Sequence, residues 1–265
     1  MNRESPLDAT FALDLENALA ADEFYLVYQP EIDLHTNGFA GVEVLIRWRH
    51  ATRGVVNPDQ FIPLLEASGA IVSVGRWALE TACYQGAEWH AKGYRFAVAV
   101  NTSSQQLRDP NFVTDVNRVL RASRLDPAHL TLEFSYAALE DSTVQENLSR
   151  IHDRGVRLAI DDFAPGRPDW SALATLPIDI VKLERAFVAE NSPTNGASLI
   201  QQVVRDARAL NLRVMASGVE DASQLDQLRH EQVDVGQGFH FARPYEVAEI
   251  DRFLEDFALF SGRPL

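Results

Sequence analysis

RLAIDDFAPGRP, residues 157–168, joins an apolar, strand-like run to a loop that contains glycine and proline. Asp161 and Asp162 stand side by side where the run ends. Adjacent negative charges repel each other and favour water, so a buried strand that ends in this pair needs an explanation. Two explanations fit: the aspartates cap the helix that follows, or a cation lies between them. The residues at the ends of the other strands decide between the two.

The apolar run is one of eight short β-rich segments that alternate with amphipathic helical patterns. The expected strands are residues 24–34, 39–48, 96–103, 129–136, 156–163, 178–184, 212–219 and 233–241. The expected helices include residues 77–93, where Gly93 is the stop, 112–123, 144–155, 197–210 and 222–231. This order predicts an α/β fold, in which a parallel sheet closes into a modified (β/α)8, TIM-like barrel.

The first two expected strands are separated by only HTNGF, residues 35–39. This hairpin-like turn favours an antiparallel first pair. A doubly wound open sheet is the alternative fold, but no glycine-rich dinucleotide loop follows the first strand. We therefore expect a single barrel domain over residues 1–265, with its core at about residues 10–260.

Composition restricts the partners of the chain. The net charge is −14, from 38 acidic and 24 basic residues, which argues against a nucleic-acid polymer as the partner. A small phosphorylated ligand remains compatible with this charge if a metal and local cations hold it. Cys83 is the one cysteine, so we expect no internal disulfide and a cytoplasmic location. No apolar run approaches the roughly 20 residues of a membrane helix, and the first residues do not resemble a signal peptide.

Polar or charged residues end nearly every expected strand. They are Gln29, Glu43, Asn101, Glu133, Asp161 with Asp162, Lys182 and Gln237. The carboxyl ends of barrel strands meet at one mouth, so we expect these side chains to converge there. Helix capping or contact with water would explain any single one of them, but the whole set points to a site.

The chemistry of this set suits a divalent cation. Four of its members offer only oxygen ligands: Glu43, Asn101, Glu133 and Asp161. Such ligands favour Mg²⁺, Mn²⁺ or Ca²⁺ over Zn²⁺. Asp162 would hold a second ion with Asp161 as the bridge, and two ions roughly 3.5–4 Å apart promote phosphodiester cleavage. Lys182 and Arg47 would contact an anionic ligand. A cation against the acidic pair therefore answers the opening question.

Several motifs together resemble a known family. YQPEIDL, GVEVLIRWRH, VNTSSQQL, LTLEFS, IDDFAPG, DIVKLERAFV, SGVED and QGFHFARP occur in the order and spacing of EAL domains, over about residues 10–260. The namesake tripeptide is Glu43-Val44-Leu45 here, with its metal-binding glutamate retained. The resemblance implies a modified barrel that hydrolyses cyclic di-GMP to the linear dinucleotide pGpG with Mg²⁺ or Mn²⁺, and that Ca²⁺ inhibits.

The resemblance also assigns roles to individual positions. It implies a first metal site of Glu43, Asn101, Glu133 and Asp161, and a second metal held by Asp162. Lys182, near the attacking water, and Asp162 are the implied catalytic residues. The implied ligand contacts are Gln29, Glu43, Val44, Leu45, Arg47, Asn101, Asp161, Lys182, Gln237 and Pro244.

One departure from the family pattern affects the general base. Ser217, in ASGVE at residues 216–220, replaces the first glutamate of the family's Ala-Glu-Gly-Val-Glu, while the interval to Gln237 keeps the family spacing. In the family this glutamate helps to position or deprotonate the attacking water, and loss of a general base lowers rates by roughly 10²–10⁴-fold. Glu220 is a poor substitute because it lies three residues further along an extended strand and points elsewhere.

Two further departures concern the loop after the aspartates. The family's Asp-Asp-Phe-Gly-x-Gly-x-Ser-Ser is DDFAPGRPDW here, in which Ala164 lacks the positive φ open to glycine and two prolines remove amide donors. Tyr136 replaces the second glutamate of the Glu-x-x-Glu motif that anchors this loop. In the family the loop organises the second metal and links dimerisation to activity. The resemblance thus implies a homodimer, and the altered loop puts its usual mode in doubt.

These patterns predict retained nucleotide binding with weak or absent hydrolysis. The leading hypothesis is a cyclic di-GMP receptor that passes its occupancy to a signalling partner protein. The alternatives are a slow or activatable phosphodiesterase and an interaction scaffold that no longer binds nucleotide; an unrelated metal-dependent barrel enzyme fits fewer motifs. A scaffold would show a blocked barrel mouth, with Arg167 or Trp170 folded over the site or Tyr136 filling it.

Overall fold

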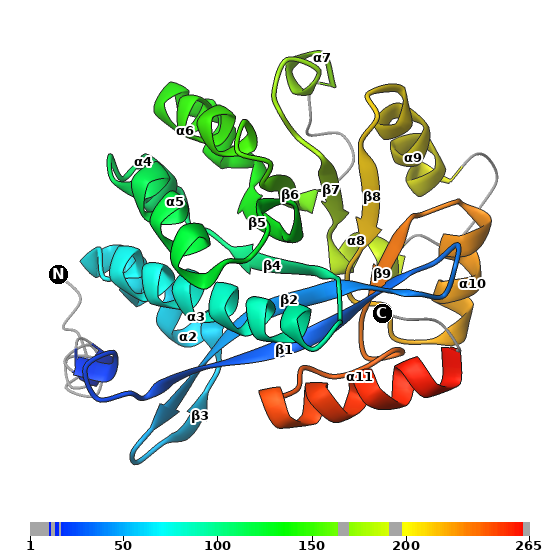
Figure 1. Ribbon diagram of the computed structural model, residues 1–265. Helices are drawn as coiled ribbons and strands as arrows, with labels where there is room; N and C mark the ends of the chain where they lie inside the picture. The colour runs from blue at the N-terminus through cyan, green and yellow to red at the C-terminus, as the bar shows by residue number, and fades with distance from the viewer. Residues whose placement is uncertain (1–10, 12–13, 16, 164–169, 191–197, 262–265) are drawn as a thin grey trace, which may run out of the picture.

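The computed structural model describes residues 11, 14–15, 17–163, 170–190 and 198–261. Within them, eight strands close into a barrel and a ninth, β3, extends β2 as a hairpin (Figure 1). The strands are β1 (Phe24–Asp33), β2 (Phe39–His50), β3 (Gly54–Val56), β4 (Ala97–Asn101), β5 (Leu130–Ser135), β6 (Arg157–Phe163), β7 (Ile180–Leu183), β8 (Arg213–Ala216) and β9 (Val235–Gln237). They pair in the order β1-β9-β8-β7-β6-β5-β4-β2-β3, and pairing of β1 with β2 closes the ring. The predicted modified TIM-like barrel is confirmed.

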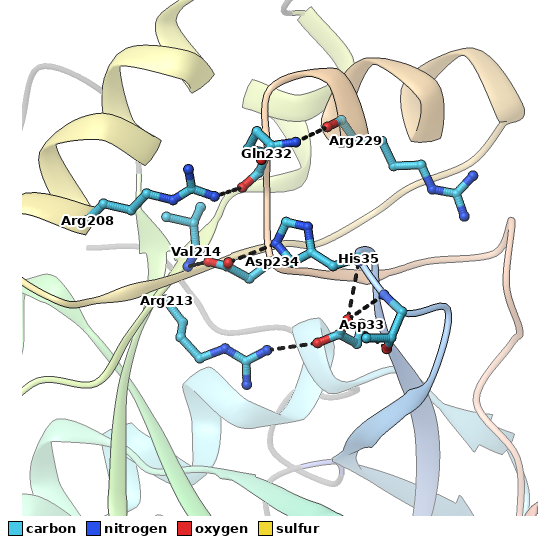
Figure 2. Close-up of polar contacts among 9 residues, drawn as sticks. Asp33, His35, Arg208, Arg213, Val214, Arg229, Gln232 and Asp234 are labelled. Atoms are coloured by element: carbon cyan, nitrogen blue, oxygen red, sulfur yellow. Dashed lines mark hydrogen bonds and ion pairs between the residues drawn. The ribbon is translucent and has the colours of Figure 1, made fainter. Parts of the chain in front are cut away.

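β1 is the antiparallel strand of the barrel. It pairs antiparallel with β2 along nearly its whole length and with β9 through Glu31↔Gln237, whereas the other neighbours in the ring are parallel. The predicted antiparallel first pair is confirmed. β1 therefore ends opposite to the other barrel strands, where Arg213 Nη2 lies 3.3 Å from Asp33 Oδ2 and His35 Nε2 lies 3.1 Å from Asp234 Oδ1 (Figure 2).

Helices surround the barrel (Figure 1). They are α2 (Pro58–Ser68), α3 (Ile71–Ala91), α4 (Ser104–Arg108), α5 (Phe112–Ser123), α6 (Ser142–His152), α7 (Trp170–Leu173), α8 (Arg185–Glu190), α9 (Leu199–Ala209), α10 (Ala222–His230) and α11 (Val247–Ser261), with 3₁₀ turns η1 (Pro127–His129) and η2 (Tyr136–Glu140). α5 has the predicted bounds, and Gly93, at φ +98°, follows the end of α3 as predicted. No helix within the described ranges is both long and apolar enough to cross a membrane.

The core lies in two parts. The larger part packs the barrel strands against their helices and includes the fully buried Leu132, Leu158 and Val214. The smaller part covers one end of β1 and β2, where the tilted rings of Phe11 and Trp48 pack with centroids 4.9 Å apart. Burial of such side chains contributes about 1.5–3 kcal/mol each, so the barrel is a rigid frame for the groups at its mouth.

Cys83 lies fully buried in α3. Burial raises the pKa of its thiol to about 12, with a smaller contribution from the charge of Glu80. We expect Cys83 to resist alkylation by iodoacetamide at about pH 8 in the folded protein and to react readily in urea, because the thiolate is the reactive form. Mass spectrometry would measure the modified fraction, and rapid modification of the folded chain would contradict this placement.

Candidate functional site

A buried lysine joins two of the predicted metal ligands. Lys182 Nζ, on β7, lies 2.8 Å from Glu133 Oε2 and 2.9 Å from Glu43 Oε2. Burial alone would lower the pKa of Lys182, but the carboxylates around it, Glu133 first and then Glu43, raise it well above the usual value. The lysine is therefore a permanent positive charge within the barrel.

Amide groups fix the carboxylate of Glu43. Asn101 Nδ2 donates to Glu43 Oε1 at 2.7 Å, and Gln237 Nε2 donates to Glu43 Oε2 at 2.6 Å. Gln237 Nε2 also lies 3.2 Å from Gln29 Oε1, and Gln29 Nε2 donates to the carbonyl of Ala242 at 3.1 Å. Burial opposes ionisation of Glu43, but Lys182 and these amides lower its pKa below the usual value, so Glu43 is ionised. Four strands thus contribute to one hydrogen-bonded network.

Glu133 differs electrostatically from Glu43. Burial raises the pKa of Glu133 well above its usual value, and the charge of Lys182 only partly offsets this effect. Glu43 and Asp161 add to the rise by repulsion. The site therefore holds more carboxyl groups than its one lysine can keep ionised, which is the condition that favours an added cation.

Two predicted strand-end residues lie within strands. Gln29 and Glu43 occupy the middle of β1 and β2, where they are register partners across the antiparallel pair. The expectation that each polar residue ends its strand was wrong here, because β1 runs in the opposite direction and β2 continues to pair with β3. Their side chains nevertheless join the network of the other strands.

The acidic pair faces a cavity at the barrel mouth. Asp161 and Asp162 line a space of about 520 Å³ together with Asn101 and Glu133. Burial raises the pKa of Asp161, with Lys182 opposing and Glu43 and Asp162 reinforcing the shift. Asp162 has φ +53°, in the left-handed region that aspartate tolerates better than most residues. The backbone thus turns directly at the pair, at the end of β6.

One wall of this cavity comes from α2, a helix that the sequence patterns did not predict. α2 contributes Pro58, Asp59, Ile62, Pro63 and Glu66. A signal was available, because proline at the first turn and Gly69 at the end, with φ +79°, are typical helix start and stop residues. The cavity therefore combines carboxylates with an apolar wall, which suits a ligand that has both anionic and ring parts.

The oxygen-rich donor set fits a hard divalent cation by its chemistry. Asn101, Glu133 and Asp161 line the same cavity, and Asn101 contacts Glu43. In the part of the chain that the structure describes, no three or more His, Cys, Asp or Glu side chains are arranged to hold a metal ion. A metal here would compete with Lys182 for Glu43 and Glu133. The two metal sites remain predictions.

Ser217 follows β8 beside the network. Its Oγ donates to the carbonyl of Leu183 at 2.8 Å, and its backbone N–H donates to the same carbonyl at 3.2 Å. Glu220 forms an ion pair with Arg185. The acidic side chain nearest in sequence is thus engaged by Arg185.

The structure places two of the three residues, Tyr136 and Trp170, that would block the barrel mouth in a scaffold. Tyr136 lines a separate hollow of about 130 Å³ with Leu139 and Leu173 and is absent from the lining of the larger cavity. Trp170 packs on Phe163 with ring centroids 5.3 Å apart. Arg167 and the rest of the loop at 164–169 lie outside the described residues.

The remaining predicted ligand contacts divide into two groups. Val44 and Leu45 line the large cavity. Arg47 lies half-buried on β2, where Nη1 donates to the carbonyl of Ile46 at 2.8 Å, and burial lowers its pKa. Pro244 precedes Tyr245, whose backbone N–H donates to the carbonyl of Tyr28 at 2.9 Å, so it lies against β1 next to Gln29.

Comparison with known proteins agrees with this geometry. A family profile described as "EAL domain" matches residues 12–244. In Pseudomonas aeruginosa, the cyclic di-GMP phosphodiesterase PA2567 is 34% identical over 92% of this chain, and the cyclic di-GMP phosphodiesterase NbdA is 35% identical over 95%. The chain spans only 42% and 33% of the lengths of these two relatives.

A solved structure superposes on nearly the whole of this chain. "PaMucR Phosphodiesterase, c-di-GMP complex" superposes with a TM-score of 0.86 at 32% identity, over 91% of this chain and 99% of that chain. The EAL domain of FimX from Pseudomonas aeruginosa, bound to c-di-GMP, gives a TM-score of 0.81 at 22% identity, over 88% and 95% of the two chains. This second likeness shows a shared fold alone.

Proposed function

This chain belongs to the EAL domain family, and we propose that it binds cyclic di-GMP as a receptor whose own hydrolysis of the nucleotide is weak or absent. The observation that carries the proposal is at position 217, where a serine hydroxyl donates to the carbonyl of Leu183. A hydroxyl is no base at neutral pH, so this position supplies no general base. Asn101, Glu133, Asp161 and Asp162 meanwhile line the cavity of about 520 Å³.

In the proposed complex, charged and apolar residues would contact different parts of the metal-bound nucleotide. Glu43, Asn101, Glu133, Asp161 and Asp162 would hold Mg²⁺ or Mn²⁺, the ions that the family resemblance implies. When bound, such ions neutralise phosphate oxygens and lower the pKa of a bound water. Lys182 holds Glu43 and Glu133 in place. The apolar residues of α2 in the cavity wall, Pro58, Ile62 and Pro63, would lie against the bases.

A slow phosphodiesterase is the second candidate function. It is favoured by the names of PA2567 and NbdA, both cyclic di-GMP phosphodiesterases, and by the retained Asp162 and Lys182. A scaffold without nucleotide binding is less favoured, because Tyr136 lines a different hollow and not the large cavity.

Calorimetric titration of the purified chain with cyclic di-GMP and Mn²⁺ tests the proposal. We expect saturable binding, with heat that returns to baseline after each injection. Heat that continues after each injection, accompanied by pGpG on chromatography, would favour the phosphodiesterase. Absence of binding at high micromolar nucleotide would leave only the scaffold.

Arg47→Met should weaken the binding of cyclic di-GMP by about 10- to 150-fold, because a hydrogen bond from a charged donor to a ligand contributes roughly 1.5–3 kcal/mol. Arg47 donates to the carbonyl of the preceding Ile46, a local contact that the fold should tolerate losing. Arg49→Met is the matched control, because Arg49 lies on the same strand and pairs with Glu246 at an exposed position. Equal affinities of the two variants in the same titration would exclude a phosphate contact by Arg47.

A further inference from the structure

Glu31 is a buried carboxyl group that the predicted site does not use. It lies on β1, 6% exposed, and its register partners are Gln237 on β9 and Gly41 on β2. A Cβ at Gly41 would lie 2.7 Å from the carbonyl oxygen of Ala97 and 2.8 Å from Glu31 Oε2, so glycine at that position leaves room for both groups. Glu31 points into the barrel, where it lines a cavity of about 30 Å³ with Glu133 and Thr131.

Two oxygen atoms at this point have no hydrogen-bond partner within the described part of the chain. They are Glu31 Oε1 and Gln237 Oε1, and both are buried. Side chains of directly paired residues lie on the same face of a sheet, with their Cβ atoms about 4.5–5.5 Å apart. Buried polar atoms rarely remain unpaired, because each one costs about 1–3 kcal/mol. A single shared hydrogen would satisfy both.

The hydrogen bonds of its nitrogen, Nε2, fix the orientation of the Gln237 amide. Its Nε2 donates to Glu43 Oε2 and to Gln29 Oε1. A flipped amide would place its oxygen 2.6 Å from the Glu43 carboxylate, where the two would repel. Gln237 Oε1 therefore remains an acceptor that only a donor can satisfy, and Glu31 is its register partner on β1.

We propose that Glu31 is a positioning residue whose protonated carboxyl donates a hydrogen bond to Gln237 Oε1 and so fixes the amide that holds Glu43. The O–H stays on Glu31, and no proton is transferred. The role in metal and nucleotide binding rests on the proposed function, because Glu43 is a predicted metal ligand. An ionised Glu31 would instead place two repelling oxygens side by side and turn Gln237 away from Glu43.

The surroundings of Glu31 support a neutral carboxyl. Burial raises its pKa to about 7, partly offset by Lys182, while Glu43 raises it further and Arg213 lowers it. Glu133 and Arg157 also line the small cavity. Lys182 is engaged by Glu133 and Glu43, and Arg213 by Asp33, so neither of these cations forms an ion pair with Glu31 among the described residues.

Two variants of equal length separate the hydrogen bond from packing. Glu31→Gln keeps a donor for Gln237 Oε1, whereas Glu31→Met fills the same space without one. Calorimetric titration with Mn²⁺ alone should show an affinity about 10–100-fold weaker for Glu31→Met, and an affinity within about threefold of the original for Glu31→Gln, since outer-shell partners of metal ligands typically contribute this much. Equal effects of both variants would overturn the proposal.

A readout without metal or nucleotide keeps this proposal separate from the proposed function. In chain labelled with ¹³C at the glutamate carboxyls, the resonance that Glu31→Gln removes should have the shift of a carboxylic acid at about pH 6, one unit below the pKa of about 7. The side-chain amide signals of Gln237 should be retained in Glu31→Gln. A carboxylate shift for Glu31 would overturn the hydrogen bond, even if Mn²⁺ binds. Failure of the unaltered chain to bind Mn²⁺, with a carboxylic-acid shift at Glu31, would refute the metal site and leave the hydrogen bond standing.

Discussion

Ser217→Glu should raise the rate of cyclic di-GMP hydrolysis by about 10²–10⁴-fold, the range that a general base contributes. Residue 217 follows β8 and contacts the carbonyl of Leu183, the residue next to Lys182. A glutamate at this position would therefore stand beside the lysine that the resemblance places near the attacking water. Formation of pGpG, followed by chromatography with Mn²⁺ present, measures the rate.

Ser217→Gln is the matched control for this experiment. Glutamine has the length of glutamate but cannot accept the proton of water, so its rate should remain at the level of the original chain. An equal rise in both variants would mean that side-chain length, and not basicity, was missing. An unchanged rate for Ser217→Glu would show that weak hydrolysis has a cause other than the missing base at position 217.

Lys182→Met should lower the free energy of unfolding by about 3–5 kcal/mol, because removal of one partner of a buried ion pair leaves an uncompensated charge. Here the ammonium faces two carboxylates, Glu43 and Glu133, and the lysine and Glu133 side chains are each only 2% exposed. Urea unfolding in metal-free buffer, followed by tryptophan fluorescence, measures the change. Lys92→Met is the matched control, since its exposed pair with Asp251 should contribute at most about 1 kcal/mol.

The loss in the free energy of unfolding that Lys182→Met causes should grow between about pH 5 and pH 8. Burial already raises the pKa of Glu133, and loss of the lysine removes the charge that lowers it. A carboxyl whose pKa is higher in the folded than in the unfolded state binds its proton more tightly when folded, so stability falls as pH rises. Lys182 itself remains protonated across this range in the original chain, because its pKa is raised. A deficit that shrinks with rising pH would contradict this account.

The closed barrel could be predicted because its strands have a clear signature. Residues 156–163 and 129–136 read as short apolar runs between amphipathic helices, and the structure places β6 and β5 there. β3 is only three residues long and carries little periodic signal. α2 has two prolines, Pro58 and Pro63, which obscure its helical pattern.

Part of the site could be predicted from the direction of the strands and the types of residue at their ends. Asn101 and Lys182 were placed at the mouth by the rule for parallel strands, and both take part in the network. The role of Glu31 was not predicted, although it lies two residues from Gln29 and therefore on the same face of β1. Its importance depends on Gln237, which the register of a strand near the other end of the chain brings beside it.

The way in which β1 completes the ring also governs when the barrel can form. Gln29 and Gln237 contact each other although they are 208 positions apart in the chain. On the ribosome, β1 is synthesised before β9, and until β9 is available the outer edges of the partial sheet have no strand to pair with. Such edges are prone to association with other chains, and contacts of long sequence separation slow folding. The same closure that draws Gln29, Glu43 and Gln237 together therefore leaves the nascent barrel prone to aggregation until β9 has been synthesised.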